Sequence, residues 1–300
     1  MMPLAEPVSP DVLAEELTPE TYITRFKDLE VHMFEGAEVP SVLDEVGRIR
    51  EREYRRVGAG RNVARDLDAF DTGEVAYSQL VSFDRAEGEL VAMYRAIHCG
   101  SALDRGGPQA LRTSGLFDYS QPFLTGELPR LVELGRSVVN RNAKRAVQGL
   151  FSVWSGLGAL IREWPDTLGF FGNVSVYSDV SEEQLDTLLA YLYHFHGDKE
   201  TRVTAKPSCA YRSRRELSNV PESFEALTER TSSEGWNVPP ILVSYLKASP
   251  GLIAFDTAVD RDFGLAREIA VMVPVNTITP KTRKRIVDPY VSVNPGRFVR

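Results

Sequence analysis

The residues best suited to chemistry lie in one short segment near the middle of the chain. Residues 131–139 (LVELGRSVV) form an apolar run with β-strand character that carries Glu133 and Arg136. Charged side chains in such a strand need a partner or a chemical role. A basic loop, 140–146 (NRNAKRA), and an apolar helical stretch, 147–161, follow. Positive charge and free backbone N–H groups at a helix N-terminus favour binding of a phosphate group.

The composition is that of an ordinary globular protein. Of the 300 residues, 43% are hydrophobic and 26% are charged. No apolar run approaches the roughly 20 residues of a membrane span, and the N-terminus lacks a signal-peptide pattern, so we expect a cytoplasmic location. The net charge of −7 argues against nucleic-acid binding. Cys99 and Cys209 are too few for a disulfide framework, and no metal site is expected.

Helices and strands are predicted in an α+β order around one mixed sheet. Helical periodicity and capping residues indicate helices at 42–56, where Ser41 is the expected cap, and at 147–161, 181–194 and 239–248. Strands are expected at 27–34, 76–83, 89–97, 131–139, 169–178, 251–259 and 268–275. The interpretation is a flexible leader, 1–25, and a single domain, 26–300, with an irregular insert at about 197–238.

Six short patterns follow one another along the chain, and each alone is weakly specific. They are EVGRIRE at 45–51, DLDAFD at 66–71, VAMYR at 91–95, LFDY at 116–119, ELGRS at 133–137 and FGNVS at 171–175. Together, in this order, they resemble the hemolysin-like GNAT acyltransferases. That family includes the ornithine and glycine N-acyltransferases of bacterial aminolipid synthesis and is related to the acyl-homoserine lactone synthases. The similarity covers about residues 30–270.

The resemblance implies a GNAT fold, with helices on both faces of a mixed sheet whose two central strands splay apart. Those strands would be 131–139 and 169–178, and the pantetheine arm of an acyl thioester would enter between them. The resemblance assigns the donor side to Ser137, Val138, Val139, Arg141, Lys144 and Arg145. Lys144 stands where GNAT proteins often have a glycine, which favours acyl-carrier protein over coenzyme A as donor. No tightly bound cofactor is implied.

The acceptor side implied by the resemblance is a polar cluster. A zwitterionic amino acid needs an arginine for its carboxylate and carboxylates for its ammonium group. The resemblance gives acceptor binding to Arg50, Asp68, Asp71 and Arg95, and catalysis to Glu133 and Arg136. Glu133 would be the general base, because an amine must lose a proton to attack a thioester. The alternative is a buried salt-bridge network that only holds the N-terminal segment to the sheet.

The function implied is N-acyl transfer that makes a lyso-aminolipid. A fatty acyl group, 3-hydroxylated or not, would pass from acyl-carrier protein to the α-amine of glycine or ornithine. Peripheral contact with the inner face of the membrane is reasonable for such a product. Two alternatives stay open: an enzyme like the acyl-homoserine lactone synthases, and a non-catalytic protein that binds acyl-carrier protein or membrane.

Overall fold

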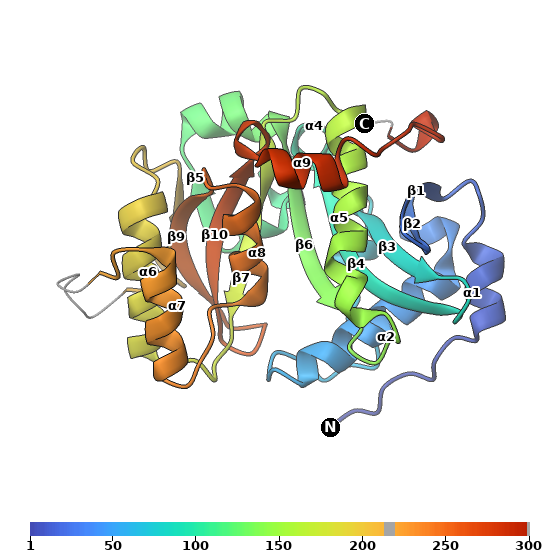
Figure 1. Cartoon of the computed structure of the whole chain (residues 1–300), viewed down its shortest axis with the longest axis horizontal. Helices are drawn as coiled ribbons and strands as arrows, with labels where there is room; N and C mark the ends of the chain where they lie inside the picture. Colours follow the sequence, from blue (N-terminus) through green and yellow to red (C-terminus); the bar gives the residue numbers. More distant parts are fainter. Residues whose placement is uncertain (213–219, 299–300) are drawn as a thin grey trace.

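A mixed eight-stranded sheet forms the centre of the protein in the computed structural model, which describes residues 1–212 and 220–298 (Figure 1). Its strand order is β1-β2-β3-β4-β6-β7-β10-β9. The strands are β1 Tyr22–Phe26, β2 Leu29–Phe34, β3 Ser78–Asp84, β4 Glu89–His98, β6 Leu131–Val139, β7 Gly169–Val176, β9 Ile253–Asp260 and β10 Ala266–Pro274. A separate small sheet pairs β5 (Phe117–Tyr119) with β8 (Val203–Ala205).

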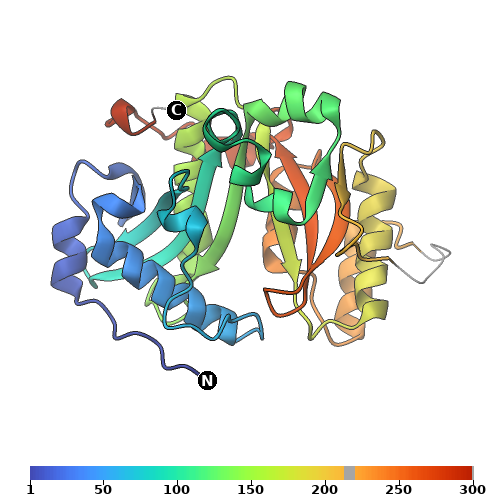
Figure 2. The ribbon, with the colours of Figure 1, turned by 180° about the vertical axis from the view of Figure 1, so that it is seen from behind.

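Helices cover both faces of the large sheet, as the sequence predicts. They are α1 Pro10–Glu16, α2 Pro40–Arg55, α3 Ala69–Thr72, α4 Cys99–Gly106, α5 Ala146–Glu163, α6 Glu182–His196, α7 Phe224–Ser233, α8 Pro240–Ala248 and α9 Pro280–Ile286. On one face, helices α5 to α8 share a core with Val174 and Ile269. The opposite face, seen in Figure 2, is covered by α2, whose Val46 and Ile49 pack with Val138. Within the described residues, no helix is long and apolar enough to cross a membrane.

The two central strands separate partway along their length. Strands β6 and β7 run parallel and pair only from Leu131–Gly169 to Leu134–Gly172, after which they diverge (Figure 1). Gly172 marks the point of divergence: its φ is +156°, and a Cβ atom there would lie 2.4 Å from the carbonyl oxygen of Leu134. A side chain at this position would therefore push the strands apart too early. The splayed central sheet that the family resemblance implies is confirmed.

The predicted elements agree with the structure in most places. Strand β6 has the predicted bounds, and the predicted helices are present as α2, α5, α6 and α8. Ser41 does not cap α2, because Val39 holds the cap position and the carboxylate of Glu16 accepts from the amides of Ser41 and Val42 at 3.2 and 2.9 Å. That contact ties α1 to the start of α2.

Two segments contain more structure than the sequence indicates. Residues 1–25, where a flexible leader is expected, contain α1 and most of the β1 strand, and Leu13 and Leu17 are buried. The insert at 197–238 contains β8 and α7, and its residues 213–219 lie outside the described part. Both segments pack against the sheet through a few apolar side chains, which gives too short a pattern for periodicity to detect.

Candidate active site

The gap between the splayed strands holds a cavity of about 380 Å³. Residues 134–139 of β6 and 170–175 of β7 line its two sides, and β10 adds Glu268, Val271 and Val273. Beyond Leu134 and Gly172 the facing edges of β6 and β7 no longer pair with each other. Unpaired strand edges leave backbone N–H and C=O groups for a ligand, and a cavity of this size suits a small-molecule substrate.

The cavity is polar on one face of the sheet and apolar on the other. The polar part is lined by Arg95, Arg112, Glu133, Arg136, Asn173, Ser175, Asp260 and Glu268. The apolar part is lined by Leu150 of α5 and by Ile241 and Tyr245 of α8, beside Val174 and Val271 of the sheet. A charged group and a hydrocarbon chain can therefore occupy the same cavity at opposite ends.

A β-bulge aims Arg136 into the polar part. Regular alternation would place Glu133 and Arg136 on opposite faces of β6. Between β4 and β6, however, the pairs Met93–Val138 and Arg95–Gly135 enclose one extra residue on β6, and Arg136 has φ +53°. Such a conformation costs about 1–3 kcal/mol in a residue other than glycine and is concentrated at functional sites.

The bulge brings the Arg136 guanidinium to the same face as Glu133. Arg136 Nε lies 2.8 Å from Asp66 Oδ2, and its Nη2 lies 3.6 Å from Asp68 Oδ2. The guanidinium also lies over the rings of Phe263 and Tyr54, at 4.8 and 5.5 Å from the centroids. These contacts fix the orientation of a cation at the cavity wall.

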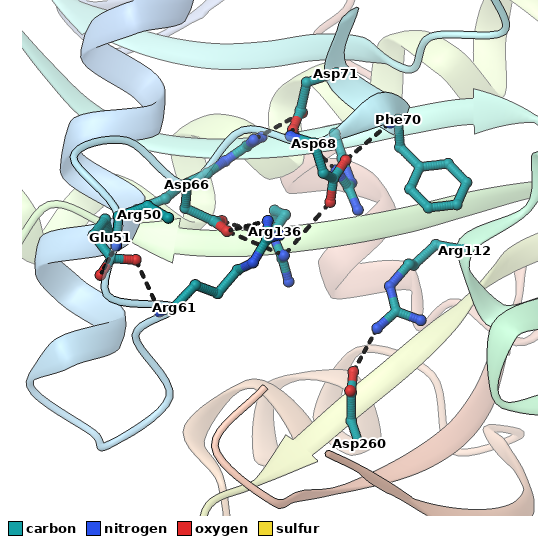
Figure 3. A network of polar contacts seen from close by, with 12 residues as sticks. Arg50, Glu51, Arg61, Asp66, Asp68, Phe70, Asp71, Arg112, Arg136 and Asp260 are labelled. Carbon is teal, nitrogen blue, oxygen red and sulfur yellow. Dashed lines mark hydrogen bonds and ion pairs between the residues drawn. The ribbon is translucent and has the colours of Figure 1, made fainter. Parts of the chain in front are cut away.

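A chain of arginine–aspartate ion pairs supports this wall (Figure 3). Arg50 Nη1 donates to Asp71 Oδ1 at 2.8 Å, and its Nη2 donates to Gln79 Oε1 at 2.6 Å. Arg95 Nη1 donates to Asp68 Oδ1 at 2.7 Å and to Asp71 Oδ2 at 3.1 Å. The side chains of Arg50 and Arg95 are 0% and 1% exposed. Burial of guanidinium groups at this depth requires such pairing.

These ion pairs act as fixed charges and not as proton carriers. Burial alone would raise the pKa of Asp71, but the charges of Arg50 and Arg95 outweigh it and hold that pKa well below its usual range. Burial alone would lower the pKa of Arg95, but Asp71 and Asp68 hold it above its ordinary value. Both partners therefore stay ionised near neutral pH.

Glu133 is held rigidly at the polar end of the cavity. Its Oε1 accepts hydrogen bonds from Tyr77 Oη and from the Thr113 amide, both at 3.0 Å. Its Oε2 accepts from Thr113 Oγ1 at 2.8 Å. Burial raises the pKa of Glu133, against the opposing hydrogen bonds of Thr113 and Tyr77 and the charge of Arg95. A buried, oriented carboxylate with a raised pKa has the properties of a general base.

A second buried carboxylate, Glu268 of β10, lies on the other wall of the cavity and was not singled out from the sequence. Glu268 pairs with Ser175 of β7, and Ser175 Oγ donates to its Oε1 at 2.8 Å. Burial raises the pKa of Glu268 to about 7, and nearby Asp260 adds to the rise. The sequence does contain a pattern that could have identified it. Glu268 is the one acidic residue in the largely apolar run 267–273 (REIAVMV), as Glu133 is in its own strand.

Arg112 and Asp260 also escaped the sequence analysis. Arg112, at the start of a short 3₁₀ helix (Arg112–Gly115), pairs with Asp260 at the end of β9. Figure 3 shows this pair apart from the aspartates that hold Arg136. Neither residue belongs to a local sequence motif, because the two are 148 residues apart and meet only in the folded chain.

The predicted site residues fall into three groups in the structure. Those that line the cavity are Arg95, Glu133, Arg136, Ser137, Val138, Val139 and Arg141. Arg50, Asp68 and Asp71 lie behind that lining and hold it through the ion pairs described above. Lys144 and Arg145 do not line the cavity.

The basic loop differs from the expected phosphate cradle. Lys144 Nζ pairs with Glu87 at 2.6 Å, and the Lys144 amide donates to Glu89 at 2.8 Å. Arg145 pairs with Asp84 at 3.1 Å. The Lys144 amide is thus not free for a phosphate group. Arg141, whose side chain is 64% exposed, is the basic residue of this loop that reaches the cavity.

Comparison with known proteins gives a consistent assignment. Residues 49–154 match the acetyltransferase (GNAT) domain family. A glycine N(alpha)-acyltransferase of Phocaeicola vulgatus is 30% identical over 311 residues, covering 98% of this chain and 95% of that protein. The glycine N(alpha)-acyltransferase of Bacteroides thetaiotaomicron is also 30% identical, with 98% and 92% covered.

Solved structures of acyl-homoserine lactone synthases show only distant similarity. The synthase LasI is 12% identical, with a TM-score of 0.44 over 90% of this chain and 98% of that chain. The CoA-dependent synthase MesI is 14% identical, with a TM-score of 0.37 over 88% and 96%.

Proposed function

This chain belongs to the GNAT acyltransferase family that includes these glycine N(alpha)-acyltransferases, and from that premise we propose that it transfers a fatty acyl group from a carrier thioester to the amino group of glycine. The observation that carries the proposal is a cavity that has one polar and one apolar end. A hydrocarbon chain fits the apolar end. A zwitterion requires the charged end.

The acceptor would lie against the polar wall. Arg136, fixed by Asp66 and by two aromatic rings, is the candidate partner for the glycine carboxylate. Glu133 is the candidate general base, acting directly or through a water molecule. Arg50, Asp68 and Asp71 would then position these groups from behind the lining, and Arg95 would lie at the cavity wall beside them.

The donor would enter along the unpaired edge of β6. Backbone N–H groups at Ser137–Val139 are candidates to polarise the thioester carbonyl. Arg141 stands at the cavity with most of its side chain in solvent, where it can meet a phosphate group. A single contact of this kind suits the one phosphate of phosphopantetheine, so we propose acyl-carrier protein as the donor. Release of an acylated amino acid is compatible with peripheral contact with a membrane surface.

Purified protein supplied with a long-chain acyl-carrier protein and glycine tests the proposal directly. We expect thiol release together with an N-acylglycine in the mass spectrum. Glu133→Gln should lower turnover about 10²- to 10⁴-fold, as expected for loss of a general base. The exposed Glu74→Gln is the matched control and should leave turnover unchanged.

Parallel reactions identify the substrates. Ornithine in place of glycine tests the acceptor, and acyl-coenzyme A in place of the carrier protein tests the donor. Folded protein that forms no acyl-amino acid from any of these combinations would refute the proposed reaction.

A further inference from the structure

The cavity wall opposite Glu133 carries three polar side chains, Asn173, Ser175 and Glu268. Glu268 is 4% exposed and receives a hydrogen bond from Ser175 Oγ at 2.8 Å. Asn173, two residues before Ser175 on β7, lies on the same face of that strand. Its Oδ1 atom is buried and has no hydrogen-bond partner within the described residues. A buried acceptor without a donor is unfavourable by about 1–3 kcal/mol, and a ligand in the cavity can supply that donor.

The surroundings of Glu268 favour a cationic donor. The two arginines that act on it, Arg112 and Arg136, are engaged with Asp260 and Asp66. Its other charged neighbour, Asp260, repels a second negative charge. Tyr177, which also lines the cavity, faces this region as a neutral phenol because burial raises its pKa. An ammonium group placed here would relieve both the repulsion and the unfilled acceptor.

The proposed reaction requires more than one proton to leave the acceptor nitrogen. An ammonium group carries three protons and the amide product keeps one. One proton must leave before attack, because a protonated nitrogen has no lone pair. The second leaves as the C–N bond forms and the C–S bond breaks, and the departing sulfur takes up one proton to become a thiol. One proton is therefore released to solvent for each amide made.

We propose that Asn173, Ser175 and Glu268 form the subsite for the acceptor amine, in which the Glu268 carboxylate takes the first proton and Asn173 Oδ1 accepts a hydrogen bond from the same nitrogen. This inference rests on the proposed function. The two proton transfers are assigned to carboxylates on two walls of the cavity. Glu268 deprotonates the ammonium group and then releases that proton to solvent. Glu133 accepts the second proton as the C–N bond forms and returns it to the sulfur.

Glu133 and Glu268 differ in their hydrogen bonds and in pKa, as two separate proton-transfer roles require. Glu133 receives hydrogen bonds from Thr113 and Tyr77 on both of its oxygens, which hold it in one orientation. Glu268, in contrast, receives a side-chain hydrogen bond from Ser175 on one oxygen, Oε1. Burial raises the pKa of Glu268 to about 7, so it is both ionised and protonated in appreciable amounts near neutral pH. A base works best when its pKa lies near the operating pH.

The pH dependence of glycine turnover tests the subsite. For the wild-type protein we expect kcat/KM to rise with pH to about 7 and then to level, because Glu268 must be ionised to accept the proton. Glu268→Gln should lower kcat/KM about 100-fold or more near pH 7. Its rate should then keep rising by about tenfold per pH unit, because only the free amine in solution reacts.

An acceptor whose amine is already neutral separates a chemical role from a structural one. Aminooxyacetate has such an amine together with a carboxylate. Glu268→Gln should therefore keep most of its turnover with aminooxyacetate while losing it with glycine. Equal loss with both acceptors, or an unchanged pH profile with glycine, would overturn the subsite.

Ser175→Ala provides a second variant that keeps the carboxylate. Loss of the Ser175 hydrogen bond removes a contact that lowers the pKa of Glu268. The rising limb of the profile should move to higher pH, and a limb that stays in place would count against Glu268. No acylglycine from the wild-type protein at any pH would overturn the proposed function as well. Acylglycine with an unaltered Glu268→Gln profile would overturn the subsite alone.

Discussion

Replacement of Glu268 by glutamine should stabilise the folded protein at neutral and alkaline pH. Burial raises the pKa of Glu268 from the ordinary value of 4.5 to about 7 in the folded protein. The unfolded chain keeps the ordinary value, so above pH 4.5 the unfolded carboxyl ionises first and the folded state binds more protons. The free energy of unfolding therefore falls as pH rises through this window and levels above about pH 7.

The size of the effect follows from these two pKa values. A tenfold difference in proton affinity corresponds to about 1.4 kcal/mol, so the difference between 4.5 and about 7 corresponds to roughly 3 kcal/mol. Between about pH 5 and about pH 8, ionisation of Glu268 should lower the free energy of unfolding by roughly 2.5 kcal/mol. Glutamine does not ionise, and its carbonyl oxygen can still accept the hydrogen bond from Ser175. In the variant, residue 268 should therefore make no pH-dependent contribution to the free energy of unfolding.

Urea titrations at the two pH values measure this difference. The fall in the free energy of unfolding from the lower to the higher pH should be about 2–3 kcal/mol larger for the wild-type protein than for Glu268→Gln. Glu74→Gln, an exposed glutamate, should behave like the wild type. An equal fall in wild type and Glu268→Gln would show that the folded state does not perturb this carboxyl, and the reasoning would be refuted.

Two further substitutions test the support of the cavity. Asp71→Asn leaves the buried guanidinium groups of Arg50 and Arg95 without their shared counter-charge, and should lower the free energy of unfolding by about 3–5 kcal/mol in urea titrations. Gly172→Ala sets a Cβ atom 2.4 Å from the Leu134 carbonyl oxygen at a φ of +156°, and should lower the melting temperature through a loss of about 2–4 kcal/mol.

Each of these substitutions has a matched control in the same chain. Asp44, 45% exposed, pairs with Arg65 at 3.2 Å on the surface, and Asp44→Asn should change stability by less than about 1 kcal/mol. A Cβ atom at Gly126 would meet nothing within 4 Å, so Gly126→Ala should be close to neutral. If Asp71→Asn and Asp44→Asn changed the free energy of unfolding equally, the buried ion pairs would contribute no more to stability than a surface pair. If Gly172→Ala and Gly126→Ala had equal effects, the predicted clash with the Leu134 carbonyl would be refuted.

Local sequence patterns were sufficient for most of the fold. Helix α2 was predicted because Val42, Val46 and Ile49 recur on one face, and all three are buried. Strand β6 was predicted with its observed bounds because an apolar run of β-branched and leucine residues ends at a polar loop. Periodicity succeeds in these elements because each buries a continuous face. The splay of β6 and β7 followed from family resemblance and not from any local pattern.

The features of the site that sequence analysis did not predict depend on contacts between residues far apart in the chain. The bulge at Arg136 reverses the side that alternation predicts, and it is visible only in the register with β4. Lys144 and Arg145 were assigned to the donor from the family resemblance and the basic character of their loop, but acidic residues of the β3–β4 turn and its neighbours form ion pairs with both. Glu268 is recognisable in the sequence as a lone acid in an apolar run, but its place beside Ser175 follows only from the pairing of β10 with β7.

Several locally unfavourable features coincide at the cavity, and this coincidence is itself evidence for function. Arg136 adopts a strained backbone conformation, and within the described residues Asn173 Oδ1 lacks a hydrogen-bond donor. Glu268 is a buried carboxylate whose pKa is raised to about 7 by burial. Each lowers stability by roughly 1–3 kcal/mol when considered alone. A sequence selected only for stability would remove such features one at a time, since single substitutions suffice. The proposed binding and proton transfer would explain why these three features are kept at one cavity.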